Sequence, residues 1–438
     1  MPEEAGRQPA HATAEAAASD AAGAAAARDP WRDADFVRLF AAATVSNFGS
    51  MITMLAVPLL AIRELHASPA ELGALRTLGL VPGIAFGLAA GAWVDRLRKR
   101  PALVGSDLAL GALYAGTGVA GALGALRIEH LYAVALAAGA LGFLFHVARD
   151  AYLPGLVGPS QLVAANARLR GGKAATEGAG FAAGGWLVQL LGAPVALLVD
   201  ACTFFASAAL LGRIRRPEPA PAPREAEHGP GARQALRELA AGVRHAAADP
   251  TLRRLAVATA LLAGSWQVIG VVYLLFLDGL GFDPGWLGLV FAAGAASSVI
   301  GAAAAAALGR RFGARHAMWT GVLVLGLSAL LVPLVPGPGA LGFALLVAQQ
   351  LGDGGEVVFD VHQTSVRQGA VPAELRGRVA GAFAFVGQAA MLAGSVLGGA
   401  LGTALGPRAT LAAGALGLLL AVPAVARVTL PRPRSEAR

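Results

Sequence analysis

Three acidic residues recur at helical intervals within one apolar segment. The stretch VAQQLGDGGEVVFDVHQ spaces Gln349, Asp353, Glu356 and Asp360 four, three and four residues apart, so a helix would place all four on one face. An ionisable residue inside a membrane helix costs about 2.5–3.5 kcal/mol and normally faces a cavity. Desolvation and a second carboxyl group nearby both favour the protonated form of a carboxyl group, which is the property that a proton carrier needs. We expect Asp353 or Glu356 to bind a proton or cation, and the glycines in 352–355 to let this helix bend. In the alternative, Glu356 and Asp360 lie at the lipid headgroups.

Two more acids lie inside apolar segments, each about two helical turns from an end. Glu177 follows the start of one segment, and Asp200 lies in LLVDACTFFASAALL. Such residues either transfer protons or hold their helix to its neighbours. Both roles stay open for Asp200, and we rank both residues below the helix with three acids.

Two pairs of a polar and an aromatic residue lie near the middle of long apolar segments. They are Asn47 with Phe48, and Trp266 with Gln267. Such a pair suits an amphipathic organic substrate, as does Gln349. It also suits a hydrogen bond between helices, which contributes about 0.6–2 kcal/mol in a membrane.

Motifs for enzymatic chemistry are missing from the sequence. It has no P-loop, no His or Cys cluster with metal-ligand spacing and no nucleophile elbow. The single cysteine, Cys202, lies in an apolar segment, so no disulfide framework is expected. We therefore expect no enzyme, cofactor or metal. A proton gradient, or the gradient of the substrate itself, would drive any transport.

The composition indicates an all-α membrane protein. Of 438 residues, 56% are hydrophobic and 14% are charged, whereas about a quarter of the residues in soluble proteins are charged. Apolar segments of about twenty residues recur along the chain, and each is long enough to cross the membrane as a helix.

Breaks in hydropathy predict twelve transmembrane helices in two bundles. The helices are expected near 36–62, 70–94, 102–126, 131–149, 171–191, 194–212, 254–277, 285–308, 317–335, 339–361, 378–402 and 408–427. The bundles would span 36–213 and 254–428. Residues 1–35 and 429–438 would be cytoplasmic tails, and 214–253 a cytoplasmic linker. Within the linker, GARQALRELAAGVRHAA has the spacing of an amphipathic helix at the membrane surface.

The distribution of basic residues predicts the orientation. With a cytoplasmic N-terminus, all Lys and Arg residues lie in cytoplasmic segments except Arg63, Arg76, Arg127 and Arg408. This asymmetry follows the positive-inside rule, so both termini of a multi-pass protein of the cell membrane should be cytoplasmic. The net charge of +8 then suits contact of the cytoplasmic basic residues with anionic lipid headgroups of the membrane. We expect no binding to nucleic acid.

The chain contains an internal repeat. VDRLRKRP after the second helix resembles GRRFGARH after the eighth, which aligns Arg96 with Arg311. LVGPSQLVAANA after the fourth helix resembles AVPAELRGRVAGA after the tenth, which aligns Leu162 with Leu375. Because both alignments have nearly the same offset, the two bundles should be parallel repeats.

These segments resemble a known family. Gly91 through Asp95 and Arg96, followed by Arg98, Lys99 and Arg100, is similar to the signature loop of the major facilitator superfamily. LPGLVGPSQLVAANARLRGG, LLVDACTFFASAALL and SVRQGAVPAELRGRVAGAF resemble its bacterial efflux branch, which includes enterobactin exporters and macrolide efflux pumps. One departure is Arg98, where the superfamily usually has glycine.

The resemblance implies a gating role for Asp95. In this superfamily the matching aspartate contacts the N-terminus of helix eleven in the other half, here near Gly377 and Arg378. Such a contact with a helix terminus contributes about 0.3–2 kcal/mol. Alternatively, the bases of the loop only anchor the topology, and Asp95 is their solvated counter-ion.

Three functions remain open at this point. The first is an exporter of small amphipathic compounds of drug, antibiotic or siderophore type, which exchanges them for protons by alternating access. The second is a facilitator or symporter that imports a small solute. The third is a membrane sensor or scaffold without transport. The resemblance favours the exporter, and the fold functions as a monomer.

Overall fold

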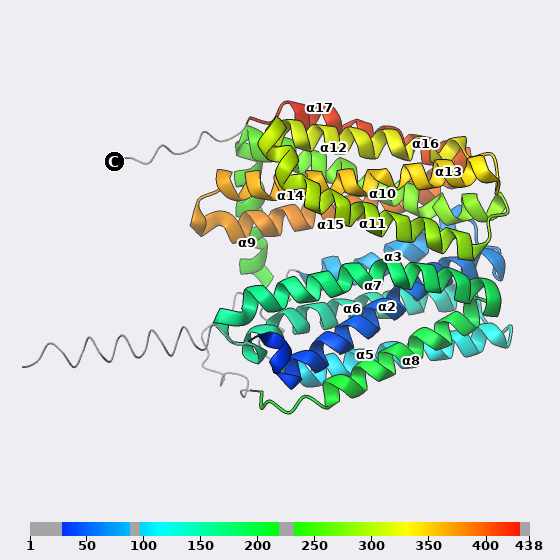
Figure 1. Cartoon of the computed structure of the whole chain (residues 1–438). Helices are drawn as coiled ribbons and strands as arrows, with labels where there is room; N and C mark the ends of the chain where they lie inside the picture. Colours follow the sequence, from blue (N-terminus) through cyan, green and yellow to red (C-terminus); the bar gives the residue numbers. More distant parts are fainter. Residues whose placement is uncertain (1–28, 88–96, 219–231, 430–438) are drawn as a thin grey trace, which may run out of the picture.

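The computed structural model describes residues 29–87, 97–218 and 232–429, and its regular elements are all helices (Figure 1). The first half contains six long helices. They are α2 (Ala34–Arg63), α3 (Pro69–Gly87), α5 (Lys99–Ala122), α6 (Ile128–Leu156), α7 (Leu162–Leu191) and α8 (Ala193–Gly212). Short 3-10 turns, η1 (Pro30–Arg32) and η2 (Pro159–Gln161), precede α2 and α7.

The second half repeats this order. Its helices are α10 (Pro250–Gly279), α11 (Pro284–Phe312), α12 (Ala314–Ala329), α13 (Ala340–Gln349), α14 (Leu351–Ala370), α15 (Arg376–Leu405), α16 (Pro407–Leu419) and α17 (Ala421–Ala426). The turns η3 (Val332–Leu334) and η4 (Ala373–Leu375) follow α12 and precede α15. The predicted tenth helix is thus the pair α13 and α14, interrupted at Gln350, and the twelfth is α16 and α17.

Nine helices in the described part of the chain are long and apolar enough to cross a membrane. The helices α3 and α7 and the α13–α14 pair are not among these nine, and they complete two bundles of six. Each of the three carries charged residues, such as Arg76 in α3, Glu177 in α7 and Asp353 in α14. The all-α fold with twelve spans in two parallel repeats is therefore confirmed.

Matching elements of the two halves share their local geometry. Gly192 and Gly406, which join the last two spans of each half, have φ of +81° and +79°. Both lie in the region that favours glycine. Gly313 before α12 has φ +79°, whereas Arg98 before α5 has φ −70°. The first half therefore enters α5 through an extended residue, where the second half uses a glycine turn.

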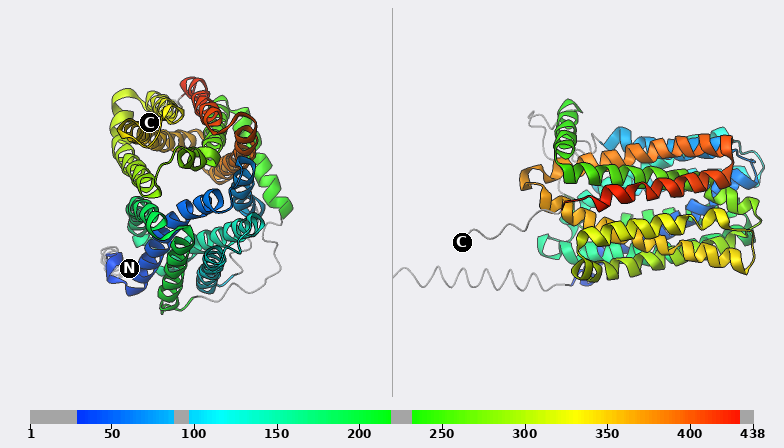
Figure 2. Two further views of the ribbon diagram at one scale, coloured as in Figure 1. Left: turned by 90° about the vertical axis from the view of Figure 1, so that its right-hand side faces the viewer. Right: turned by 90° about the horizontal axis from the view of Figure 1, so that it is seen from above.

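The two halves lie side by side, and the first and last described residues lie at the same end of the bundles (Figures 1 and 2). We call this the termini end and the opposite one the distal end. At the distal end, glycines bring the halves into close contact. A Cβ on Gly288 of α11 would lie 2.3 Å from the Phe181 carbonyl oxygen of α7. A Cβ on Gly73 of α3 would lie 2.8 Å from the Ser395 carbonyl oxygen of α15.

The termini end is more open. Cβ atoms built on Gly87 of α3 and on Gly377 and Gly381 of α15 would meet no atom of the described residues within 4 Å. The halves are therefore sealed against each other at the distal end and separated at the termini end.

The predicted amphipathic helix of the linker is α9 (Ala232–Ala248), and it crosses the termini end (Figure 1). It packs against α15 and α10. Gly242 allows this contact, since a Cβ there would lie 2.3 Å from the Arg378 carbonyl oxygen. Ala246 on the apolar face of α9 is only 5% exposed. The helices α15 and α10 therefore cover part of the face that we expected to lie on the membrane surface.

Candidate functional site

A cavity of about 130 Å³ lies between the two halves. Its walls come from α2, α3 and α7 of the first half and from α10, α11, α12, α13 and α14 of the second. The polar residues that line it are Arg76, Gln267, Tyr273, Gln349, Gln350 and Asp353. The sequence predicted Trp266, Gln267, Gln349 and Asp353 as cavity or coupling residues, and the fold brings all four to this central cavity.

Hydrogen bonds between spans orient the polar groups of the central cavity. Arg76 Nη1 donates to Gln267 Oε1 at 3.3 Å, which joins α3 to α10. The Tyr273 hydroxyl donates to Gln349 Oε1 at 3.3 Å, which joins α10 to α13. A Cβ on Gly270 would lie 2.9 Å from Arg76 Nη1, so the absence of a side chain at residue 270 makes room for the guanidinium.

Asp353 lies in the first turn of α14, directly after the interruption at Gln350. Its Oδ1 atom and Gln350 Nε2 are buried without a hydrogen-bond partner among the described residues. A Cβ on Gly294 of α11 would lie 2.3 Å from Asp353 Oδ2, so glycine is required at that position as well. The carboxyl group is thus accommodated by its neighbours without being neutralised by them.

Aromatic rings form one wall of the central cavity. Phe181 of α7 stacks on Phe291 of α11 with 5.2 Å between ring centroids. The Tyr273 ring lies 5.6 Å from that of Phe291. Because Phe181 and Phe291 belong to different halves, a flat apolar molecule bound here would contact both bundles at once.

A second cavity, of about 300 Å³, lies within the first half. Asn47, Glu177 and Asp107 line it, together with residues of α6 and α8. Asn47 Nδ2 donates to Thr176 Oγ1 at 2.7 Å. Asp107 of α5 is 0% exposed, and neither of its carboxyl oxygens has a hydrogen-bond partner among the described residues. The predicted residue Asn47 therefore faces this cavity of the first half, while its neighbour Phe48 packs against the hydrophobic core.

The remaining predicted acids differ in their surroundings. Glu177 forms an ion pair with Lys173 at 3.5 Å. Asp200 is fully buried and accepts hydrogen bonds from the hydroxyl groups of Thr53 and Thr203. Glu356 is partly buried and Asp360 is exposed, and neither lines the central cavity. The four residues of the predicted polar face are therefore not equivalent.

The glycines of the three-acid segment pack helices together. The interruption lies at Gln350, before these glycines. A Cβ on Gly354 would lie 2.8 Å from the Ser297 carbonyl oxygen of α11, and one on Gly355 would lie 2.5 Å from the Gly321 carbonyl oxygen of α12. They lie within α14, after the interruption, and they allow close contact with α11 and α12.

The signature loop is described only in part, because Gly91, Asp95 and Arg96 lie outside the described residues. Arg100 donates to the carbonyl groups of Leu211 and Gly212 at the end of α8. The backbone amides of Lys99 and Arg100 donate to the Glu218 carboxylate. Arg98 is exposed, and the Arg311 guanidinium lies 5.3 Å from the ring centroid of Phe312. Arg100 thus attaches α5 to α8.

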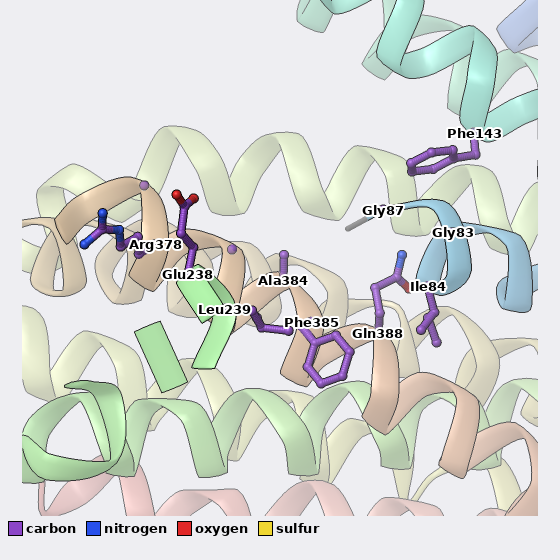
Figure 3. A pocket seen from close by; sticks show the side chains of 12 residues that line it. Gly83, Ile84, Gly87, Phe143, Glu238, Leu239, Arg378, Ala384, Phe385 and Gln388 are labelled. Carbon is purple, nitrogen blue, oxygen red and sulfur yellow. The ribbon is translucent and has the colours of Figure 1, made fainter. Parts of the chain in front are cut away.

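A third cavity, of about 390 Å³, opens between the halves toward the termini end (Figure 3). Gly83 and Ile84 of α3 and Phe143 of α6 line one side. Residues of α9 and α15, among them Phe385 and Gln388, line the other. This opening lies between α3 and α15, the pair of helices whose distal ends are in contact.

Comparison with known proteins identifies the family. The model of the Major Facilitator Superfamily matches residues 39–395 and 255–438. The chain belongs to this superfamily. It is therefore a multi-pass membrane protein and a secondary transporter of small molecules, not an enzyme.

Individual members of the superfamily resemble the chain over most of its length. The multidrug efflux pump Tap of Mycolicibacterium fortuitum is 29% identical over 405 residues, which cover 90% of this chain and 95% of Tap. The structure of a mutant of the nucleoside transporter NupG superimposes with a TM-score of 0.73 at 14% identity, covering 89% of this chain and 98% of NupG. The structure of a bacterial homologue of the iron transporter ferroportin in an inward-facing state superimposes with a TM-score of 0.71 at 17% identity, covering 91% of this chain and 98% of that protein.

Some residues of the cavities in this major facilitator were missed by sequence reasoning. Arg76 was noted only as a cation within a span, although a lone Arg in an apolar segment is itself a signal of function. Asp107 was overlooked because it lies close to the basic end of its segment. Phe181, Tyr273 and Phe291 carry no sequence signal, since aromatic residues in membrane helices usually face lipid or other helices.

Proposed function

We propose that this transporter exports small amphipathic compounds of drug, antibiotic or siderophore type from the cell in exchange for protons. One observation carries the proposal: the halves share a cavity in which charged, polar and aromatic side chains face one space. Alternating access requires such a site at the interface of the two repeats. The likeness to the multidrug efflux pump Tap supports export over import.

The orientation of the chain is part of the proposal. By the positive-inside rule, both termini are cytoplasmic and the distal end is external. The close contacts of Gly73 and Gly288 then seal the external side, and the opening between α3 and α15 leads to the cytoplasm. In this state the protein would accept its substrate from the cytoplasm or the inner leaflet of the cell membrane.

Asp353 is the acid that we propose as the proton carrier. It lines the central cavity, and Oδ1 has no hydrogen-bond partner in the described residues. A buried carboxylate without a partner is costly, and a bound proton removes its charge. Glu177 and Asp200 have a basic and two hydroxyl partners, respectively. These partners favour structural roles for Glu177 and Asp200.

The proposed gate remains the signature loop. Asp95 would contact the N-terminus of α15 when the cytoplasmic ends of the halves approach each other. Because Asp95 lies outside the described residues, this contact is proposed from the resemblance of the loop alone.

Cellular accumulation tests the proposed function. Cells with and without the protein are loaded with a panel of dyes, antibiotics and siderophores, before and after collapse of the proton gradient. We expect the protein to lower accumulation of at least one amphipathic compound, and collapse of the gradient to abolish the difference. Higher accumulation in cells with the protein would support the importer instead. Equal accumulation across the panel would contradict export.

A further inference from the structure

Arg76 is the basic residue in the lining of the central cavity, and among the described residues it has no acidic partner. Within the described parts of the chain, the guanidinium of Arg76 has a single hydrogen bond, of 3.3 Å to the neutral Gln267. No described acid lies within 4.0 Å of it. The first half thus contributes an uncompensated cation to the central cavity.

The second half contributes an uncompensated acid to the same cavity. Asp353 and Arg76 both line it, yet they form no ion pair with each other. Asp353 Oδ1 accepts no hydrogen bond from the described residues. Charged groups held away from water are costly unless they are paired. A ligand with charges of both signs would compensate both residues at once.

We infer that the substrate is an amphipathic zwitterion with an aromatic body. Its anionic group binds the Arg76 guanidinium, and its cationic group binds the Asp353 carboxylate. Its rings pack against Phe181 and Phe291. Because the two charged contacts come from different halves, the ligand joins the bundles across the cavity. The inference rests on the proposed function, since it names the substrate class of the same site, and it explains exchange because proton and substrate compete for Asp353.

Three dyes with one ring system test this inference. They are a rhodamine with a free carboxyl group, which is a zwitterion, its methyl ester, which is a cation, and fluorescein, which is an anion. Binding to the purified protein is followed by the fluorescence anisotropy of each dye, which rises when the dye binds. This readout needs neither a proton gradient nor transport.

We expect the wild-type protein to bind the zwitterion at least about tenfold more tightly than either of the other dyes, because each lost charged hydrogen bond weakens binding by that order. Arg76→Gln should lower the affinity for the zwitterion about tenfold and change the affinity for the ester by less than about twofold. Arg76→Lys should retain part of the affinity for the zwitterion. Asp353→Asn should lower the affinity for the zwitterion and for the ester but not the affinity for fluorescein. Arg127→Gln, which changes an exposed arginine at the distal end, is the matched control.

Two results would overturn the inference. One is equal affinity of the wild-type protein for the zwitterion and its ester, with no change in Arg76→Gln. The other is the absence of zwitterion binding. If cells nevertheless exported the cationic ester in a proton-dependent manner, the proposed function would stand without the inferred substrate class. If the zwitterion bound as expected but no compound were exported, the inferred class would stand and the proposed direction would fall.

Discussion

Arg63 Nε donates to Asp278 Oδ1 at 2.6 Å across the two halves. Arg63 is the last residue of α2, and Asp278 is the next-to-last residue of α10, the first helix of the second half. The pair therefore joins equivalent positions of the two repeats at the distal end. Together with the glycine contacts of α3–α15 and α7–α11, it closes this end of the cavity.

Neutralising this ion pair should loosen the distal end. The Arg63 side chain is 42% exposed and that of Asp278 is 18% exposed, and exposed pairs contribute about 0.2–1 kcal/mol. We expect Arg63→Gln to increase the ratio of distally open to closed molecules by up to about fivefold. Spin labels at Leu123 and Leu334, in a Cys202→Ser background, report the distance between the two halves at the distal end. The exchange of charges, Arg63→Asp with Asp278→Arg, should restore the wild-type distribution of this distance. A distance distribution unchanged by Arg63→Gln would contradict the role of the pair.

A side chain at Gly288 should open the same end more strongly. A Cβ there would lie 2.3 Å from a backbone oxygen of α7, and overpacking of this kind costs about 1–3 kcal/mol. Gly288→Leu should therefore shift the same spin-label distribution toward the open state. Gly116→Leu is the control, because a Cβ on Gly116 meets open space. Equal effects of the two variants would show that the α7–α11 contact does not determine the state.

Neutralising Asp353 should uncouple transport from protons. If Asp353 carries the proton, Asp353→Asn should abolish substrate movement against a gradient and retain downhill exchange, which requires no net deprotonation. Wild-type substrate binding should weaken as the pH falls and Asp353 gains its proton, whereas binding by Asp353→Asn should lose this pH dependence. Counterflow and proton-driven uptake in inverted vesicles measure the two activities.

Asp360→Asn serves as the matched control for this experiment, because Asp360 is an exposed acid on the same helix. Glu356→Gln, Glu177→Gln and Asp200→Asn complete the comparison. Full proton-driven export by Asp353→Asn would exclude Asp353 as the carrier, and loss of coupling in one of the other variants would identify its replacement.

Asp107 and Asp200 should respond oppositely to the loss of their charge. Asp107 has no hydrogen-bond partner among the described residues, so Asp107→Asn should keep or raise the unfolding temperature in detergent. Asp200 accepts from two threonine hydroxyl groups, so Asp200→Ala should cost about 1–3 kcal/mol of stability. A larger loss for Asp107→Asn than for Asp200→Ala would show that Asp107 has a partner on which the fold depends.

Reporter fusions test the orientation. A reporter after Arg438 or within 217–230 should be cytoplasmic, and one between Asp278 and Pro284 should be external, because basic residues are retained on the cytoplasmic side. A linker reporter on the external side would reverse the proposed orientation, and the sealed distal end would then face the cytoplasm.

The sequence by itself determined the fold and the family of this protein. Hydropathy predicted the spans, because a chain that crosses lipid must satisfy its backbone groups within helices. The repeat was visible in two pairs of loop motifs, since equivalent turns such as those before α7 and α15 need similar residues. The polar and charged residues of the central cavity that the sequence predicted, such as Gln267 and Asp353, were conspicuous because polar residues are expensive in membrane spans.

Tertiary structure alone decided how these residues combine. Helical periodicity placed Asp353, Glu356 and Asp360 on one face, but the interruption at Gln350 and the packing of α11 bring Asp353 to the central cavity and leave Asp360 exposed. Arg76 and Asp353 belong to different halves, so their shared cavity depends on how the bundles meet. That contact is made by glycines at the distal end, and their effect is readable only from the backbone that approaches each of them.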